Sequence, residues 1–492
     1  MPPSHLQLRA RAFDPRRFRQ LQLWLDPRWT NGMRLSRVAE FRRATGAYLS
    51  TPAAAPLQAT TALTVEFWKN SVSLGLDRAY VGHGSYNTSG GGGWNISSGD
   101  GVNGGNSIKV YLALNANFSV IASGVTPQAT LAADWSQCVV VYNGGGATSA
   151  DRLKVYLDGV AQSLTFSGTI PATLFLPTVP LEVGRFAGLP GRELDAGMQR
   201  LRLWTVALSA AQASALYNTG AGHSHAQLAG ISGLAAPAAA WELQESSGAR
   251  ADSGPSGLTL QQQNGTVASG LLTTEVRDRG PRQLVLTAPL GTAPRWSESE
   301  ITGKPGWRTH GRQFLSGTIS DWLTAPTGDL LQVAVPLALE SAPGSPYDHG
   351  LLASGVSGST DRYAFSLFYK DTSNVLTPRL RIRNQSAPNG FVIGNSALTL
   401  GQRYVLNWRG ATGGTDGYAL RLNGQAVGLT VQSGLANTWF DDVPARDKVA
   451  LGAFITGAIV QGMGQYQFGQ QLAFGPGLSQ SANRAAERWL GV

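Results

Sequence analysis

The chain has 492 residues, of which 42% are hydrophobic and only 14% charged, and it contains 61 Gly, 25 Pro and one Cys. This length suits two domains of about 200 residues each, and the many Gly and Pro residues favour short strands and turns over long helices. A single Cys excludes an intramolecular disulfide, and no run approaches the roughly 18 apolar residues of a membrane-spanning helix.

Positive charge is concentrated at the amino terminus. The net charge is +9, and residues 1–43 alone carry ten Arg against two Asp and one Glu. A basic arm on a nearly neutral body is typical of docking onto an acidic surface, and an ordinary solvated arm is the alternative. Nucleic acid is not expected as the partner, because the segment has no recognition motif. We predict an arm over residues 1–35, with these partner-binding residues: Arg9, Arg11, Arg16, Arg17 and Arg19.

An internal repeat with an offset of about 265 to 270 residues organises the rest of the chain. Residues 153–159 (LKVYLDG) alternate and end in Asp-Gly, and residues 418–424 (YALRLNG) alternate and end in Asn-Gly. Both dipeptides are favoured in hairpin turns because they tolerate positive φ. Each copy closes with a strand followed by a short helix, for which Ser209 and Ser479 are the predicted N-caps.

The strands that lead into these two turns also correspond. We align Trp135–Tyr142 (WSQCVVVY) end to end with Gln402–Arg409 (QRYVLNWR). Within the first of these strands, Cys138 is predicted to be a small core hydrophobe and not a reactive thiol. Residues 63–68 (LTVEFW) and 332–339 (QVAVPLAL) alternate with period two, as half-buried strands do. Short strands between Gly-rich turns indicate an all-β sandwich.

Together these segments resemble the laminin-G-like members of the concanavalin superfamily. The resemblance covers about residues 36–218, and a more divergent copy covers the second half of the chain. It rests on TVEFW at 64–68, DRLKVYLDGV at 151–160, VGR at 183–185 and LRLW at 201–204. The resemblance implies two tandem antiparallel β-sandwiches, or concanavalin-like jelly rolls. After the arm, the first sandwich covers residues 36–225, a linker and edge hairpin cover 226–283, and the second sandwich covers 284–492.

This fold hosts lectins, glycosidases, adhesion modules and viral structural proteins, so it does not determine function. Glycosidases of this superfamily place carboxylates at alternate positions of one strand, where one is the nucleophile and the other the general acid. The closest approaches here are Glu298 and Glu300, in a predicted loop, and Glu193 and Asp195, in a predicted turn. We therefore expect a protein that is not an enzyme.

The sequence contains candidate residues for two kinds of ligand, a calcium ion and a glycan. Many laminin-G-like domains hold a calcium ion with an Asp, an Asn and backbone carbonyls, so the resemblance implies Asp100 and Asn103 as candidate ligands. A hairpin turn explains the same residues without a metal and is favoured, and no other cofactor is expected. Aromatic rings and amides beside a Gly-rich loop predict a glycan site made of Tyr86, Asn87, Trp94 and Asn95. The alternative is that Trp94 lies in the core, where the neighbouring glycines let strands approach closely.

These observations favour a non-enzymatic structural protein of a virion, such as a phage capsid decoration, head-fibre or tail component anchored through its basic arm. The amino terminus lacks the apolar core of a secretory signal, which suits a protein made in the host cytoplasm and carried on the virion surface. Its partners would be other virion proteins in an oligomeric assembly. The alternative is a carbohydrate-binding adhesin on a virion or cell surface, recognising host glycans.

Overall fold

A computed structural model gives the structure of the chain. It describes residues 15, 21–28, 31, 33–71, 77–99, 107–127, 135–279, 282–289, 292–301, 303–309, 313–318, 328–338, 347–356, 359, 363–383, 390–410, 418–431, 440, 443, 446–456, 459–462, 465–474 and 478–490. The chain divides into two compact units. The amino-terminal unit is Leu35–Leu272 with Pro289–Ala293, and the carboxy-terminal unit is Met1–Arg34, Thr273–Ala288 and Pro294–Val492.

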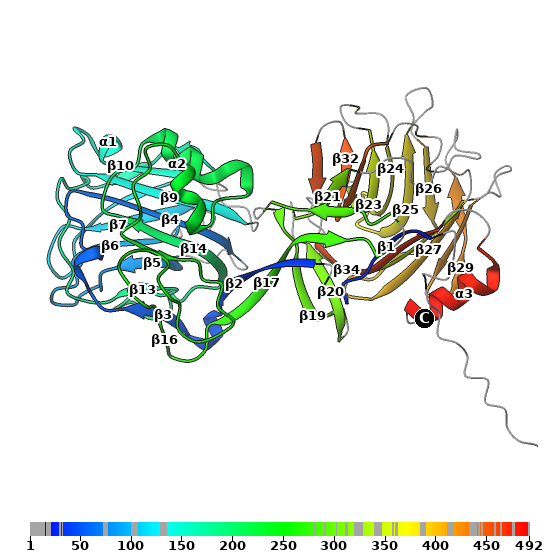
Figure 1. Cartoon of the computed structure of the whole chain (residues 1–492), viewed down its shortest axis with the longest axis horizontal. Coiled ribbons are helices and arrows are strands. Elements are labelled where there is room, and N and C mark those ends of the chain that lie inside the picture. The colour runs from blue at the N-terminus through cyan, green and yellow to red at the C-terminus, as the bar shows by residue number, and fades with distance from the viewer. Residues whose placement is uncertain are drawn as a thin grey trace, which may run out of the picture. The chain divides into compact units, whose positions relative to one another are not determined.

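The amino-terminal unit is a sandwich of two antiparallel sheets (Figure 1). The order of the first sheet is β11-β10-β9-β4-β14, and both β2 and β15 pair with β14. Its strands are β2 (Met33–Phe41), β4 (Ala62–Ser71), β9 (Ser136–Asn143), β10 (Leu153–Leu157), β11 (Val160–Gln162), β14 (Ala196–Trp204) and β15 (Ala239–Trp241). The order of the second sheet is β12-β8-β7-β6-β5-β13-β3-β16. Its strands are β3 (Tyr48–Thr51), β5 (Ala79–His83), β6 (Trp94–Ser98), β7 (Ile108–Ala113), β8 (Ile121–Val125), β12 (Thr165–Ser167), β13 (Leu181–Val183) and β16 (Gln261–Gln263).

Alternation along the strands builds the core of this unit. In β4, Leu63, Val65 and Phe67 point into the space between the sheets, where they belong to one buried cluster with Trp94 and Leu112 of the second sheet. The opposite face of the first sheet is covered by helix α2 (Ala210–Tyr217), as Figure 1 shows. The predicted N-cap Ser209 is confirmed, because its side chain accepts from Gln212 N at 3.3 Å. The remaining short elements are η3 (Arg43–Thr45), η4 (Ala55–Leu57), α1 (Ser149–Arg152), η5 (Asn218–Gly220) and η6 (His225–Gly230).

The carboxy-terminal unit has a matching architecture. One sheet has the order β29-β28-β27-β22-β34, and both β1 and β20 pair with β34. The other has the order β30-β26-β25-β24-β23-β31-β21-β18. The strands are β1 (Leu21–Leu25), β18 (Val285–Thr287), β19 (Arg295–Ile301), β20 (Lys304–Thr309), β21 (Leu315–Thr318), β22 (Gly328–Ala338), β23 (Tyr347–Gly355), β24 (Tyr363–Lys370), β25 (Leu376–Arg383), β26 (Gly390–Gly394), β27 (Tyr404–Gly410), β28 (Tyr418–Leu422), β29 (Gln425–Val427), β30 (Leu429–Val431), β31 (Lys448–Leu451), β32 (Ala453–Thr456), β33 (Ile459–Gly462) and β34 (Gln465–Phe474). Strand β17 (Ala268–Arg277) begins in the amino-terminal unit and continues into the carboxy-terminal unit from Thr273.

The strand orders of the two units correspond position by position, as an internal repeat produces. In the carboxy-terminal unit, helix α3 (Gln480–Leu490) takes the place of α2 and packs Ala486 and Leu490 on Leu331 and Leu472 of the sheet. Ser479 is confirmed as its N-cap, because its hydroxyl accepts from Ala482 N at 3.2 Å. The predicted all-β fold of concanavalin-like antiparallel sandwiches is confirmed.

The unit boundaries differ from the predicted domain ranges in two places. Residues 21–25 of the predicted arm form β1, which pairs with β34 and buries Leu23 and Leu25 completely. The apolar alternation of this segment places it in a sheet, because exposed leucines would forfeit the free energy of burial. Residues 226–272, predicted to form a linker and edge hairpin, fold with the amino-terminal unit, where β15 pairs with β14 and β16 with β3.

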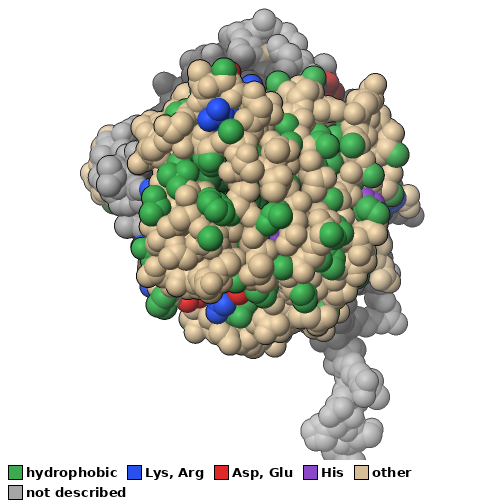
Figure 2. Space-filling model, turned by 90° about the vertical axis from the view of Figure 1, so that its left-hand side faces the viewer, with side chains coloured by type: hydrophobic (Ala, Val, Ile, Leu, Met, Phe, Trp, Pro, Cys, Tyr) green, Lys and Arg blue, Asp and Glu red, His purple; other side chains and the backbone are tan. Residues whose placement is uncertain are grey.

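The surface agrees with the low charge content of the sequence. Figure 2 shows one end of the amino-terminal unit, where hydrophobic side chains are scattered singly and in small groups among polar atoms and charged groups are few. Scattered apolar side chains are normal on a soluble surface and mark no contact area by themselves. Among the residues that the structure describes, no helix has the length and apolar character needed to cross a membrane.

Candidate functional site

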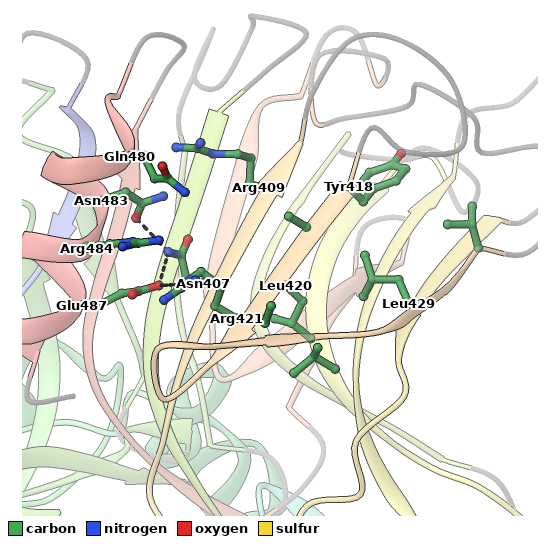
Figure 3. Close-up of a pocket in the computed structure, with 14 residues that line it drawn as sticks. Asn407, Arg409, Tyr418, Leu420, Arg421, Leu429, Gln480, Asn483, Arg484 and Glu487 are labelled. Atoms are coloured by element: carbon green, nitrogen blue, oxygen red, sulfur yellow. Dashed lines mark hydrogen bonds and ion pairs between the residues drawn. The ribbon is translucent and has the colours of Figure 1, made fainter.

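A pocket of about 480 Å³ opens in the carboxy-terminal unit beside helix α3. Figure 3 shows that residues of α3 form one wall, residues of β27 and β28 form the floor, and Leu429 lies on the far side. The α3 residues follow helical spacing, so four of them share one face of the helix: Gln480, Asn483, Arg484 and Glu487. The floor alternates with period two, so Asn407, Arg409 and Arg421 point out of the sandwich toward the pocket.

Hydrogen bonds tie the helix wall to the floor. Asn407 Nδ2 donates to Asn483 Oδ1 at 2.8 Å and to Glu487 Oε1 at 2.7 Å, as Figure 3 shows. Arg421 Nε donates to the same Glu487 oxygen at 2.8 Å. The Glu487 side chain is only 3% exposed, so this carboxylate is held by two donors in a largely dry environment.

A second charged pair lies at the upper end of the floor. Arg409 Nε and Nη2 donate to the two carboxylate oxygens of Asp329 at 2.7 and 3.1 Å, and Asn483 Nδ2 donates to Asp329 Oδ1 at 2.7 Å. Burial raises the pKa of Asp329, and the hydrogen bonds from Arg409 and Asn483 act in the opposite direction. The hydrogen bond to Asp329 is the main cause that raises the pKa of Arg409. The bidentate geometry orients the guanidinium at the edge of the pocket.

The corresponding place in the amino-terminal unit is apolar and closed. Asp158 Oδ1 accepts from Gln137 N at 2.9 Å, and Asn423 Oδ1 accepts from Val405 N at 2.8 Å. These equivalent turn contacts align Gln137 with Val405, and therefore Val139 with Asn407. The same register places Val141 at the position of Arg409. It also places Tyr156 at the position of Arg421, since Tyr156 is the cross-strand partner of Val139 and Arg421 that of Asn407. Beneath α2, the three side chains lie in one buried apolar cluster: Val139, Val141 and Tyr156.

The register differs by one residue from the sequence alignment of these strands. End-to-end alignment pairs Val139 with Leu406, whereas the turn hydrogen bonds pair it with Asn407. Because side chains alternate between faces, a shift of one residue exchanges the core and outer faces of the strand. The polar positions Asn407 and Arg409 were consequently missed. The signal was present as alternation in Tyr404–Gly410, where they interrupt Leu406 and Trp408.

Asn407 has an unused acceptor. Asn407 is only 2% exposed, and its Oδ1 has no hydrogen-bond partner among the described residues. A buried carbonyl oxygen without a donor costs about 1 to 3 kcal/mol. Asn407 lines the pocket, but this oxygen is itself buried, so a hydroxyl or amide donor of a ligand would reach it only after the side chain moves.

The predicted glycan residues do not form one surface. Trp94 is 3% exposed and belongs to the core between the sheets, which corresponds to the alternative considered for it. Asn95 points to the opposite face of β6, is 1% exposed, and accepts from Ser97 Oγ at 2.5 Å. Tyr86 is partly buried against a small apolar cluster, and only Asn87 is exposed, in a turn with φ 57°. Strand alternation separates Trp94 from Asn95 and removes the predicted aromatic platform.

Other candidates fall outside the described residues. Arg9, Arg11, Arg16, Arg17 and Arg19 of the arm lie there, as do the candidate calcium ligands Asp100 and Asn103. Within the described residues, no group of three His, Cys, Asp or Glu side chains could hold a metal ion.

Three of the four carboxylates proposed above as the closest to a catalytic pair, Glu300, Asp195 and Glu193, are engaged in other contacts. Glu300 accepts from Gln467 Nε2 at 2.9 Å and pairs with Arg308, and Asp195 lies 3.8 Å from an Arg42 nitrogen. Glu193 accepts from Gly191 N at 3.2 Å. The segment with Glu298 and Glu300 is strand β19 and not the predicted loop, because it pairs with β20.

Sequence comparison assigns the amino-terminal unit. Residues 43–214 match the laminin-G model described as the Concanavalin A-like lectin/glucanases superfamily. These residues form a domain of that superfamily. The pocket beside α3 lies outside the matched range, in the unit that repeats its strand order. A comparison with curated protein sequences finds no match.

Solved structures similar to this chain include three from carbohydrate-related or phage contexts. A Bacteroides ovatus protein provisionally described as carbohydrate-binding is 16% identical, with a TM-score of 0.35, and covers 47% of this chain. This chain spans 59% of that protein's length. The sialidase module CBM40 of Ruminococcus gnavus bound to sialyllactose is 16% identical, covering 34% of this chain and 84% of its own, with a TM-score of 0.26. Tailspike protein 2 of the Escherichia coli O157:H7 bacteriophage CAB120 is 13% identical, covering 40% of this chain and 26% of its own, with a TM-score of 0.30.

Proposed function

We propose that this chain is a non-catalytic carbohydrate-binding protein and that its binding site is the pocket beside α3. The observation that carries the proposal is a pocket lined by amide and guanidinium groups, in which the buried Asn407 Oδ1 has no donor among the described residues. A volume of about 480 Å³ lies in the range of small-molecule sites. The superfamily whose model matches residues 43–214 includes lectins, and this supports a carbohydrate as the ligand.

The lining combines the groups that sugars use. Amides and guanidinium groups of Gln480, Asn407 and Arg421 offer directional hydrogen bonds, and Leu429 and Val431 offer apolar surface for the C–H face of a pyranose ring. Both nearby carboxylates, Glu487 and Asp329, already accept hydrogen bonds from amide and guanidinium donors. Carboxylates engaged in this way support binding and not acid–base catalysis, which needs a free general acid.

The comparison with the amino-terminal unit supports a binding role over a purely structural one. A helix packed on a sheet is adequately stabilised by apolar side chains, as α2 is by Val139 and Val141. Polar residues in the same place add the cost of desolvation and leave an acceptor unused. Their presence beside α3 is explained by a ligand that completes the hydrogen bonds.

The test is binding of the full chain to a glycan array, followed by titration calorimetry with each glycan retained. Asn407→Val reproduces the side chain that the amino-terminal unit has at this position. We expect this variant to remain folded and to lose binding at least about five-fold, since one buried hydrogen bond contributes about 1 kcal/mol or more. Val160→Asn, at an exposed position of the amino-terminal unit, is the matched control. Unchanged glycan affinity of Asn407→Val would remove the pocket from the proposal.

We further propose that the protein is carried on a virion and is anchored there by its arginine-rich amino terminus. The supporting observation is the surplus of ten Arg over three acidic residues within residues 1–43. Because β1 begins at Leu21 and is buried, the test replaces Arg9, Arg11, Arg16, Arg17 and Arg19 by Gln and leaves the strand intact. Wild-type chain should co-sediment with phage particles at low salt and the variant should not. Equal co-sedimentation of both would contradict anchoring through the arm.

A further inference from the structure

The charges around the pocket are unbalanced. Among the residues that the structure describes, three Arg line it, Arg409, Arg421 and Arg484, together with one carboxylate, that of Glu487. Asp329 neutralises Arg409, and Glu487 neutralises Arg421. Within this described part of the lining, three positive charges against two negative ones leave one positive charge in excess, and that charge is on Arg484.

Arg484 is the one guanidinium of the lining without an ion pair among the described residues, whereas Arg409 and Arg421 both have one. It is exposed and extends from α3 on the same helix face as Asn483 and Glu487 (Figure 3). The first turn of α3, which carries pocket residue Gln480, has no acidic residue. The positive end of the helix dipole therefore adds to the positive potential at this end of the pocket.

We propose that the pocket selects an acidic saccharide, one whose carboxylate or sulfate ester pairs with Arg484 while its sugar ring lies on the floor of the pocket. This inference rests on the proposed function and specifies its ligand class. A guanidinium presents parallel N–H donors that match the oxygens of either anionic group. The two contacts come from the helix wall and from the floor of the pocket, so a ligand that makes both must span from α3 to β27.

The alternative to an acidic ligand is that Arg484 is an ordinary solvated side chain of α3. Arg488 provides the comparison, because it is one helical turn further along α3, is also exposed, and does not line the pocket. A solvated charge contributes alike at both positions, through long-range attraction that salt screens. A ligand contact affects only position 484.

The experiment measures binding of the full chain to matched oligosaccharides of glucose, galactose and N-acetylglucosamine. Each is presented in neutral form, with a terminal uronic acid, and with a 6-O-sulfate. Wild-type chain should bind at least one acidic form about five-fold more tightly than its neutral counterpart, the contribution of one partly exposed ion pair. Arg484→Gln should remove this preference and retain binding of the neutral form, whereas Arg488→Gln should keep the preference.

The outcomes separate the two proposals. Equal affinity of wild-type chain for neutral and acidic forms, or equal effects of Arg484→Gln and Arg488→Gln, overturns the acidic-ligand inference and leaves carbohydrate binding in place. Absence of binding to every form overturns the proposed function, and the inference with it. A preference for the uronic acid over the sulfate, or the reverse, identifies which anionic group the pocket takes.

Discussion

Glu487 Oε1 accepts a hydrogen bond from Asn407 Nδ2 at 2.7 Å, and this contact joins helix α3 to the sheet that forms the floor of the pocket. Arg421 donates to the same oxygen from the neighbouring strand β28. The pocket is thus held open by polar contacts at a place where the repeated unit is closed by apolar ones. The consequence for stability can be measured.

Glu487→Ala should lower the free energy of unfolding by about 2 kcal/mol, because it leaves Asn407 Nδ2 with one acceptor fewer and Arg421 without its carboxylate. Glu487→Gln should cost less, since it keeps an acceptor oxygen. Urea denaturation followed by tryptophan fluorescence measures both. A Glu487→Ala chain as stable as wild type would mean that the network does not support α3.

Arg202 is the centre of a buried ion-pair network in the amino-terminal unit. Its guanidinium donates to Glu66 at 3.0 Å and to Glu242 at 2.8 Å, and neither Arg202 nor Glu66 exposes any of its side chain. Burial lowers the pKa of Arg202, but the two carboxylates outweigh burial and raise it. Arg202→Met should destabilise the unit by about 3 to 5 kcal/mol, because the Glu66 carboxylate is left buried without its cation.

Two variants accompany this measurement. The double variant Arg202→Met with Glu66→Gln should recover much of the lost stability, since the stranded charge is then removed. Arg192→Met breaks the more exposed pair with Asp77 and should cost less than about 1 kcal/mol. Similar losses for Arg192→Met and Arg202→Met would show that burial does not decide the strength of these pairs.

His83 makes stability depend on pH. The residue is fully buried, its Nε2 lies 3.1 Å from Val179 O, and burial lowers its pKa to about 4. Between pH 6.5 and 4 the unfolded chain binds a proton that the folded chain does not, so stability falls as pH falls. Relative to His83→Gln, wild-type chain should lose about 2 kcal/mol more between pH 7 and pH 4.5. Parallel stability curves for the two chains would contradict this account.

Cys138 should not react in the folded chain. Its side chain has no exposed surface, and burial raises the pKa of its thiol to about 12. Ellman's reagent at mildly alkaline pH should label no thiol in the native protein and one thiol per chain in guanidinium chloride. Rapid labelling of the native protein would place Cys138 outside the core.

The elements were predictable where local chemistry decides them. Asp158-Gly159 and Asn423-Gly424 both adopt positive φ, as residues of a two-residue hairpin turn must. Ser209 and Ser479 cap their helices because a hydroxyl satisfies an otherwise unpaired N–H at a helix start. The candidate site was not predictable, since it requires Asn407, on one strand, to meet Asn483 and Glu487, about 80 residues later, on a helix.

Trp94 and Asn95 show that residue types alone can also suggest a site that the fold does not form. Their residue types suit a glycan site, but neighbouring residues in a strand face opposite ways, and the sandwich buries both. Composition and spacing do not reveal which face of a strand a second sheet or a loop will cover.

The sequence by itself determined the all-β class, the repeat, the hairpin turns and the helix caps, because each depends on the preferences of a few consecutive residues. Only the tertiary structure decided the register that aligns Val139 with Asn407, since that register is set by hydrogen bonds between strands and turns. One residue of register exchanges the two faces of a strand. For this reason the polar floor beneath α3, and with it the candidate binding site, became visible only in the folded chain.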